Sequence, residues 1–221
     1  MQHFWSDKLM AADVRLVTLL GLLDLSAAFD CVDHSILLDC LRFAVGLSVS
    51  VLDWVRSLLT DRTQQIAYSG QLSAVQLVRF GVPQGSVLGP LLYFLYTAEL
   101  ALIAACHGLS LHQYADDMQV YVSSVSRNAQ AAIACLIVCL VDVEACLKAS
   151  RLRLNSTKTQ VMWLDSLQQL AKVNVLEVPV ASTRFNISET ARDLGVVIDS
   201  QLSLSAQVAA NPPCVALAIT S

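Results

Sequence analysis

Residues 109–122 read LSLHQYADDMQVYV, and this stretch decides the fold. Leu109 to Tyr114 and Met118 to Val122 have the length and composition of short strands, and Ala115-Asp116-Asp117 joins them. The stretch predicts an antiparallel hairpin that carries two adjacent carboxylates at its tip. A pair of acids on a turn is most often a solvated surface feature, so the hairpin alone does not establish a function.

A third carboxylate ends another apolar run. Leu16 to Leu23 is continuous and short enough for a buried strand, and Asp24 follows it directly. Acids gathered in an apolar setting repel one another, so bringing them together is costly unless cations neutralise them. Hard oxygen ligands suit Mg²⁺, and two such ions can support nucleotidyl transfer. The three aspartates therefore form a candidate metal site.

The surrounding sequence predicts helices and further strands. Apolar residues recur at helical spacing in four places: after a cap at Asp33 or Ser35, over Ser48 to Leu59, over Leu91 to Ala105, and over Ala129 to Ala149. Alternating pieces predict one hairpin over Gln64 to Arg79, turning at Ser69-Gly70, and a hairpin-like region combining Val173 to Val180 with Arg192 to Ile198. This mixture predicts an α+β domain.

Composition limits the classes of function. Hydrophobic residues make up 55% of the chain and charged residues 14%, whereas a typical soluble domain has about 25% charged residues. With 14 Lys and Arg against 18 Asp and Glu the net charge is −4. Because nucleic-acid binders usually present basic patches, this balance counts against tight autonomous binding of DNA or RNA.

Neither a membrane span nor a secretion signal is expected. Val87 to Cys106 contains Pro90 and Glu99, and Ala129 to Val141 is shorter than the ~20 apolar residues that a bilayer requires. The N-terminal apolar run ends in Asp24 without a small-residue cleavage pattern. The seven cysteines form no C-x-x-C pair, which indicates reduced, mostly buried thiols. We therefore expect an intracellular protein, cytoplasmic or nuclear.

Five motifs occur in a fixed order along the chain: LLDLSAAFDCVDH (22–34), GVPQGSVLGPLLYFLY (81–96), YADDMQVY (114–121), LRLNSTKTQVM (152–162) and ARDLGVVID (191–199). Together they resemble the palm motifs of reverse transcriptases from non-LTR (LINE-type, jockey-like) retrotransposons. The resemblance covers about Leu16 to Leu204. It implies an α+β polymerase palm, in which helices pack against an antiparallel sheet that carries the acids.

The resemblance also implies a catalytic set. Asp24 would be the first metal-binding aspartate, and Asp116 with Asp117 would be the acidic pair of the YADD hairpin, together holding two Mg²⁺ ions, with Mn²⁺ as an alternative. Lys158 would lie near the triphosphate and protonate the leaving pyrophosphate, although a lysine after a turn is usually just solvated. Asp30 is not a metal ligand in this pattern.

Further residues of the motifs imply substrate contacts. Phe29 matches the bulky residue that sits under the sugar and excludes a 2′-hydroxyl, a role compatible with core packing. Pro83, Gln84 and Gly85 match a turn whose backbone approaches the incoming nucleotide and template, which glycine permits; a solvent-facing turn is the simpler interpretation of Gln84. Tyr114, the first residue of YADD, is assigned to substrate binding with them. In the first motif Asp33 is not a metal ligand, and His34 is interpreted as a helix-start residue.

The resemblance implies a palm whose fingers and thumb are largely missing. Residues 1–15 are expected to be a remnant of the fingers–palm connection, residues 16–204 the palm, and residues 205–221 a divergent, disordered tail. Exposed apolar surface is expected where fingers and thumb would dock.

Three functions remain open at this point. The family activity is RNA-directed DNA polymerisation, with an RNA template, a DNA primer and dNTPs as partners and no membrane. The alternative is a catalytically inactive retrotransposon remnant that cannot hold substrate. A two-metal nuclease is the third, and the P-Q-G turn and Phe29 favour nucleotide addition over it. The sequence does not indicate an oligomeric state.

Overall fold

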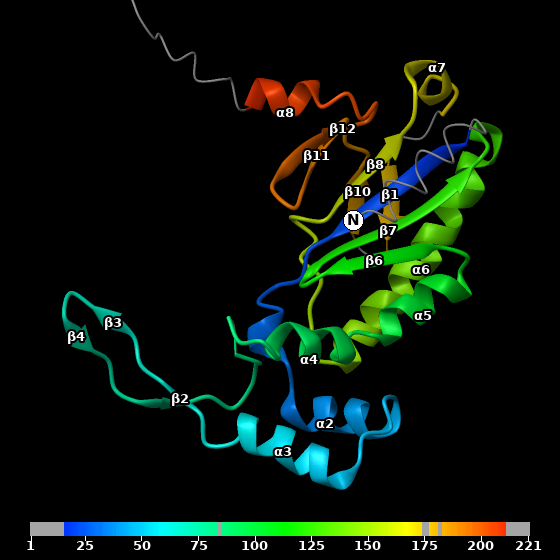
Figure 1. Cartoon of the computed structure of the whole chain (residues 1–221). Coiled ribbons are helices and arrows are strands. Elements are labelled where there is room, and N and C mark those ends of the chain that lie inside the picture. Colours follow the sequence, from blue (N-terminus) through cyan, green and yellow to red (C-terminus); the bar gives the residue numbers. More distant parts are fainter. Residues whose placement is uncertain (1–15, 84, 174–176, 181–182, 211–221) are drawn as a thin grey trace, which may run out of the picture.

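The computed structural model describes residues 16–83, 85–173, 177–180 and 183–210. At its centre is an antiparallel sheet with the strand order β6-β7-β1-β8 (Figure 1). The four strands are β1 (Val17–Leu23), β6 (Ser110–Tyr114), β7 (Asp117–Ser124) and β8 (Gln160–Leu164). The predicted strand before Asp24 and the predicted YADD hairpin are both confirmed.

The sheet is covered on both faces. Along β1, Leu19 and Leu23 belong to the main core, whereas Leu20 and Leu22 belong to a second, smaller cluster. This alternation follows from the two-residue period of a strand. Because both faces are buried, β1 reads as a continuous apolar run.

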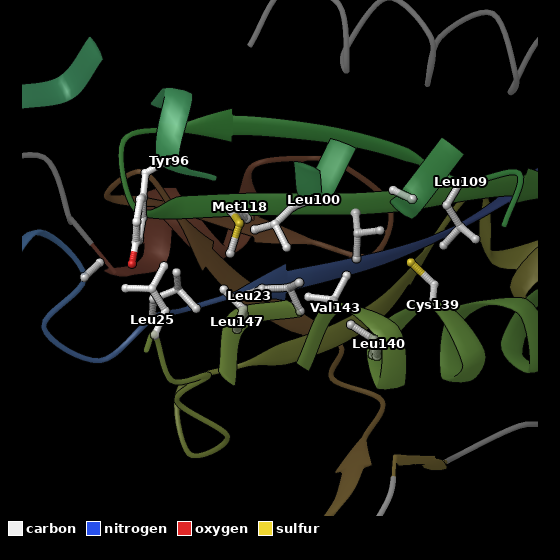
Figure 2. Close-up of a cluster of buried hydrophobic side chains, with 14 of the residues drawn as sticks. Leu23, Leu25, Tyr96, Leu100, Leu109, Met118, Cys139, Leu140, Val143 and Leu147 are labelled. Atoms are coloured by element: carbon white, nitrogen blue, oxygen red, sulfur yellow. The ribbon is translucent and has the colours of Figure 1, made fainter. Parts of the chain in front are cut away.

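Two helices cover the main-core face of the sheet, α5 (Glu99–Cys106) and α6 (Ala129–Ala149). Figure 2 shows side chains of both helices gathered against the sheet, with Leu100 of α5 near Met118 and Leu147 of α6 near Leu23. The bounds of α6 agree with the predicted helix. Burial of these side chains contributes ~25 cal/mol per Å² of apolar area and is the main stabilising term.

A helical layer lies beyond the sheet edge, with a long hairpin projecting from it (Figure 1). The helices are α2 (His34–Phe43), α3 (Val49–Leu59) and α4 (Gly89–Tyr96). The hairpin consists of the short strands β2 (Thr63–Gln64), β3 (Ala67–Tyr68), β4 (Gln71–Leu72) and β5 (Gln76–Leu77). It turns at Ser69-Gly70 as predicted, and its large apolar side chains Ile66, Tyr68 and Leu72 are exposed.

The C-terminal region differs from its prediction. Val173 to Val180 and Arg192 to Ile198 were expected to combine, but each contributes to a separate hairpin. These are β9 (Glu177–Val180) with β10 (Thr183–Asn186), and β11 (Thr190–Asp193) with β12 (Val196–Asp199), preceded by α7 (Leu167–Leu170). The β11–β12 hairpin covers the second face of the sheet through Ala191 and Ile198.

The expected tail begins with ordered structure. Ser205–Ala210 form helix α8, and the side-chain oxygen of Gln207 accepts a hydrogen bond from the backbone N–H of Val197 (2.6 Å). The expectation of disorder therefore does not describe residues 205–210. Residues 1–15 and 211–221 lie outside the described residues.

The helix predicted over Leu91 to Ala105 is interrupted. It is observed as α4 and α5, separated at Thr97-Ala98. The hydroxyl of Thr97 donates to the carbonyl oxygen of Tyr93 (3.0 Å) and accepts from Nε2 of Gln113 (2.8 Å). A threonine that bonds its preceding turn weakens the helix at that point.

Two helical stretches in the described residues, Gly89–Cys106 and Ser126–Ala149, are long and apolar enough to cross a membrane. Both bury one face in the main core, and the first is interrupted between α4 and α5. Packing in the main core accounts for the apolar residues on their buried faces.

The prediction of mostly buried cysteines is wrong. Of the six in the described residues, all are free thiols, and only Cys139 is buried. Cys135, at the same apolar spacing one turn earlier, is exposed because α6 presents that position to solvent.

A polar network fastens α2 to the end of α6. Asp33 caps α2 by accepting from the backbone N–H groups of Ser35 and Ile36, and its other oxygen lies 2.7 Å from a guanidinium nitrogen of Arg151. Burial alone would raise the pKa of Asp33, but these hydrogen bonds and the Arg151 charge hold the pKa below its ordinary value. Asp33 and His34 thus have structural roles, as predicted.

The substitution Asp33→Asn tests this network through the pH dependence of stability. Asparagine can still cap α2 but loses the ion pair, so we expect a loss of about 1–2 kcal/mol in the free energy of unfolding at pH 7. Because the folded-state pKa lies below the ordinary value of 3.8, the unfolded chain binds the proton first, and the carboxylate's contribution disappears as pH falls below about 4. Urea unfolding at pH 7 and pH 3 should show the difference between the two proteins shrinking.

The control is Asp53→Asn, because Asp53 pairs with Arg56 on the exposed surface of α3. This change should cost less than about 0.5 kcal/mol. An Asp33→Asn penalty that stays constant from pH 7 to pH 3 would contradict the assigned role.

Candidate active site

Asp116 lies on the two-residue connection Ala115-Asp116 between β6 and β7, and Asp117 is the first residue of β7, where it pairs with Tyr114. Ala115 adopts a left-handed backbone conformation (φ 55°), which is uncommon for a residue with a Cβ atom. Nε2 of Gln113 donates to the carbonyl oxygen of Ala115 (2.9 Å) and also to Thr97 (2.8 Å). The tip is therefore braced from the α4–α5 junction.

Asp24 lies at the same end of the sheet as this tip. Leu23 is paired with Met118, so the residues that follow β1 and precede β7 are neighbours. The chain after α6 then returns alongside Asp24: Leu25 and Leu154 form a β-bridge, and the backbone N–H of Asn155 donates to the carbonyl oxygen of Asp24 (2.8 Å). Strand pairing thus joins motifs that are far apart in sequence.

The turn after Asn155 brings Lys158 to this site. Its Nζ lies 3.8 Å from Oδ2 of Asp24, and the lysine is otherwise largely exposed. Asp24, Asp117 and Lys158 line one pocket of about 420 Å³. The pocket opens where the ends of β1 and β7 meet the turn.

Negative charge accumulates in this pocket. Partial burial raises the pKa of Asp117, and the charges of Asp116, Asp193 and Asp24 raise it further, with Lys158 opposing them. Oδ2 of Asp24 is buried and has no hydrogen-bond partner. The Asp117 carboxylate is thus less stable as an anion here than in water.

Asp116 faces a different pocket from Asp117. It lines a space of about 310 Å³ together with Phe29, Gly85 and Pro90. Three of the predicted motifs therefore meet around Asp116, and the acidic pair separates the two pockets.

The P-Q-G loop requires glycines for two reasons. Gly85 has a φ of +75°, and nothing lies within 4 Å of where its Cβ would be, so its conformation and not crowding favours glycine. At Gly89, a Cβ would lie 2.4 Å from the carbonyl oxygen of Pro83. Pro83 is half-buried, and Gln84 lies outside the described residues.

The remaining predicted residue, Tyr114, is exposed at the end of β6 and does not line either of these two pockets. Asp30 is exposed and lines neither of these two pockets.

One residue was missed by the sequence-based prediction. Asp193, at the end of β11, lines the Asp24 pocket, is buried, and accepts a hydrogen bond from Nε2 of Gln119 (2.7 Å). The signal was its place in the fifth motif just before Leu194-Gly195, but only the docking of the β11–β12 hairpin shows where it lies. Arg192 lines the same pocket.

The carboxylate oxygens of the aspartates are ligands of the kind that a hard divalent cation takes. Within the described residues, no group of three or more His, Cys, Asp or Glu side chains is gathered closely enough to hold an ion. Oδ2 of Asp24 has no hydrogen-bond partner, and the pKa of Asp117 is raised, so the pocket holds a surplus of negative charge that a cation would relieve.

Comparison with known proteins agrees with this geometry. The family described as "Reverse transcriptase (RNA-dependent DNA polymerase)" matches residues 4–198. The chain is 36% identical over 107 residues to the RNA-directed DNA polymerase from mobile element jockey of Drosophila funebris, covering 46% of this chain and 12% of that protein. It is 30% identical over 194 residues to a probable RNA-directed DNA polymerase from transposon BS of Drosophila melanogaster, covering 86% of this chain and 21% of that protein.

Solved structures show the same fold at low identity. Apo telomerase from Candida tropicalis, truncated from its C-terminal domain, superposes with a TM-score of 0.56 at 14% identity, covering 92% of this chain and 38% of that chain. Telomerase from Candida albicans, in complex with a fragment of telomeric RNA, gives 0.54 at 11% identity, covering 93% of this chain and 35% of that chain.

The chain spans roughly an eighth to a fifth of the length of these two curated relatives. Its sheet, its acidic hairpin and the order of its motifs coincide with the region that the family match covers. The chain therefore belongs to the reverse transcriptase (RNA-dependent DNA polymerase) family, and its relatives include the polymerases of jockey-like retrotransposons.

Proposed function

We propose that this chain is the palm of an RNA-directed DNA polymerase, in which Asp24, Asp116 and Asp117 bind divalent metal ions, Mg²⁺ or Mn²⁺. The observation that carries the proposal is the meeting of Asp24 and the acidic pair at one end of the sheet. The family match through all five motifs favours this function over an inactive remnant.

The chemistry follows from the charges of the site. Bound divalent ions would activate the primer 3′-hydroxyl and neutralise the pyrophosphate that leaves. Asp24 and Asp117 would supply carboxylate oxygens to these ions from the pocket that they share. Asp116 would supply its carboxylate oxygens from the neighbouring pocket. Nζ of Lys158, beside Asp24, would donate a proton to the leaving pyrophosphate.

The second pocket suits the sugar and base of the incoming nucleotide. Phe29 and Gly85 line it beside Asp116. The pocket therefore offers the ring of Phe29, the open backbone turn at Gly85 and the carboxylate of Asp116. We propose that Phe29 lies under the sugar and that Pro83 to Gly85 approach the nucleotide and template. We assign Tyr114, which is exposed next to the acidic pair, to substrate binding.

The partners proposed are an RNA template, a DNA primer and dNTPs. The net charge of −4 predicts that the chain by itself holds this duplex weakly, so that binding is best measured at low salt. We place the activity inside the cell, in the cytoplasm or the nucleus.

Primer extension tests the proposed function. The full chain is incubated with Mg²⁺, dNTPs and a DNA primer annealed to RNA at low salt, and Asp116→Ala serves as the control. Extension above the level of this variant supports the proposal. Equal signals from the two proteins would refute polymerase activity.

Lys158 can be tested separately as a proton donor. We expect Lys158→Arg to keep the KM for dNTP within about three-fold but to lower kcat by about 10²-fold, because arginine keeps the charge and does not release its proton. Lys158→Ala should affect both constants. Steady-state kinetics measure the two effects.

The matched control is Lys172→Ala, because Lys172 is exposed and bonds only Gln169 among the described contacts. This variant should retain both constants. Normal kcat in Lys158→Arg would contradict proton donation and leave Lys158 a purely electrostatic role.

A further inference from the structure

The ring of Phe29 is held in place from its backbone. Phe29 begins a 3₁₀ turn, Phe29–Cys31, shortly after Asp24. Its carbonyl oxygen accepts from the backbone N–H of Val82 (2.9 Å), and the N–H of Gly81 donates to the carbonyl oxygen of Val32 (2.8 Å). The first motif and the P-Q-G loop are therefore fastened together where this ring emerges.

Tyr93 supports the same ring from within the core. The centroids of the Phe29 and Tyr93 rings are 4.6 Å apart with an interplanar angle of 25°, which is a stacked arrangement. Phe29 is half-buried and lines the Asp116 pocket, whereas Tyr93 is fully buried and does not line that pocket. Phe29 thus stands between the pocket and Tyr93.

Packing of the ring does not explain why residue 93 carries a hydroxyl group. Oη of Tyr93 is buried with no hydrogen-bond partner, and leaving a buried polar group unpaired is costly. Burial, and then the nearby charge of Asp116, raises the pKa of Tyr93 well above its ordinary value, so the hydroxyl stays neutral. The contact that Tyr93 makes with Phe29 is therefore through its ring and not through its hydroxyl.

We propose that Tyr93 is the positioning residue that fixes the ring of Phe29 and thereby sets the preference for deoxyribonucleotides over ribonucleotides. Steric exclusion of a 2′-hydroxyl requires a ring that cannot move away when the larger sugar enters. Phe29 comes from a short turn, whereas Tyr93 comes from helix α4 in the core. This inference rests on the proposed polymerase function.

The test measures kcat/KM for a dNTP and for the matching rNTP with the full chain. We expect Tyr93→Met, which fills the space without a planar ring, to lower the dNTP-to-rNTP ratio about ten-fold. Tyr93→Phe, which keeps the ring, should leave the ratio within about two-fold. If the methionine variant fails to fold by circular dichroism, Tyr93→Leu replaces it.

A positioning role and a general packing role give different results. If Tyr93 acts through Phe29, the double variant Phe29→Ala with Tyr93→Met should discriminate no worse than Phe29→Ala alone. General loss of packing would lower both kcat/KM values and leave their ratio unchanged. Phe94→Leu, at an exposed ring of the same helix, is the control and should not change the ratio.

The outcomes separate this inference from the function on which it rests. If the unsubstituted chain extends a primer and Tyr93→Met leaves the ratio unchanged, the role of Tyr93 is refuted and the polymerase stands. The role of Tyr93 is also refuted if Tyr93→Phe lowers the dNTP-to-rNTP ratio as much as Tyr93→Met does. If the unsubstituted chain extends no primer beyond the Asp116→Ala level, the polymerase function and the role of Tyr93 are both refuted.

Discussion

Replacing Asp24 by asparagine will lower the rate of primer extension by about 10³-fold. Asparagine has nearly the same size, and neither the hydrogen bond from the N–H of Asn155 to the backbone carbonyl of residue 24 nor the pairing of β1 involves the side chain, so both are preserved. What it removes is the charge of an oxygen that is buried and has no hydrogen-bond partner. The loss should therefore appear in catalysis and not in folding.

Two measurements accompany this prediction. Binding of Mn²⁺, followed by its paramagnetic resonance signal, should weaken in Asp24→Asn, and the thermal midpoint should change by less than about 4 °C. Asp39→Asn, at an exposed acid of α2, is the matched control and should retain extension. Extension by Asp24→Asn at the unsubstituted rate would remove Asp24 from the metal site.

The largest effect on stability is expected at Gly81. Its φ is +85°, and an added Cβ would lie 2.9 Å from the Cα of Asp30 and 3.0 Å from the carbonyl oxygen of Phe29. Backbone atoms cannot move aside as a flexible side chain can. We expect Gly81→Ala to lower the free energy of unfolding by about 2–5 kcal/mol, combining ~1–2 kcal/mol for the left-handed conformation with ~1–3 kcal/mol for crowding.

Gly108→Ala separates these two contributions. Gly108 has a similar φ of +72°, but nothing lies within 4 Å of its missing Cβ. This variant should lose only about 1–2 kcal/mol, and the thermal midpoint of Gly81→Ala should lie several degrees below it. Equal losses in the two variants would show that the first motif and the P-Q-G loop are not in close contact.

Local signals in the sequence were sufficient for the elements that carry the acids. The apolar run before Asp24 and the break at Ala115-Asp116 depend on neighbouring residues, and both were predicted correctly. The cap at Asp33 was also predicted, because capping needs only the residues two and three positions later.

Features that depend on distant contacts were not predictable in this way. The break at Thr97 depends on Gln113, which reaches it only after the sheet has formed. The place of Asp193 depends on a hydrogen bond from Gln119, and the separate C-terminal hairpins depend on which strands pair. The spacing of apolar residues in a sequence indicates whether a segment is a helix or a strand, but it does not indicate which distant segment it contacts.

The most direct test of the polymerase assignment is template-dictated nucleotide addition. One DNA primer is annealed to two RNA templates that differ only in the first unpaired base, and the chain is supplied with Mg²⁺ and each dNTP in turn. We predict that the chain adds only the complementary nucleotide on each template and that Asp116→Ala adds none. Addition that ignores the template base, or a signal no greater than that of Asp116→Ala, would contradict the account.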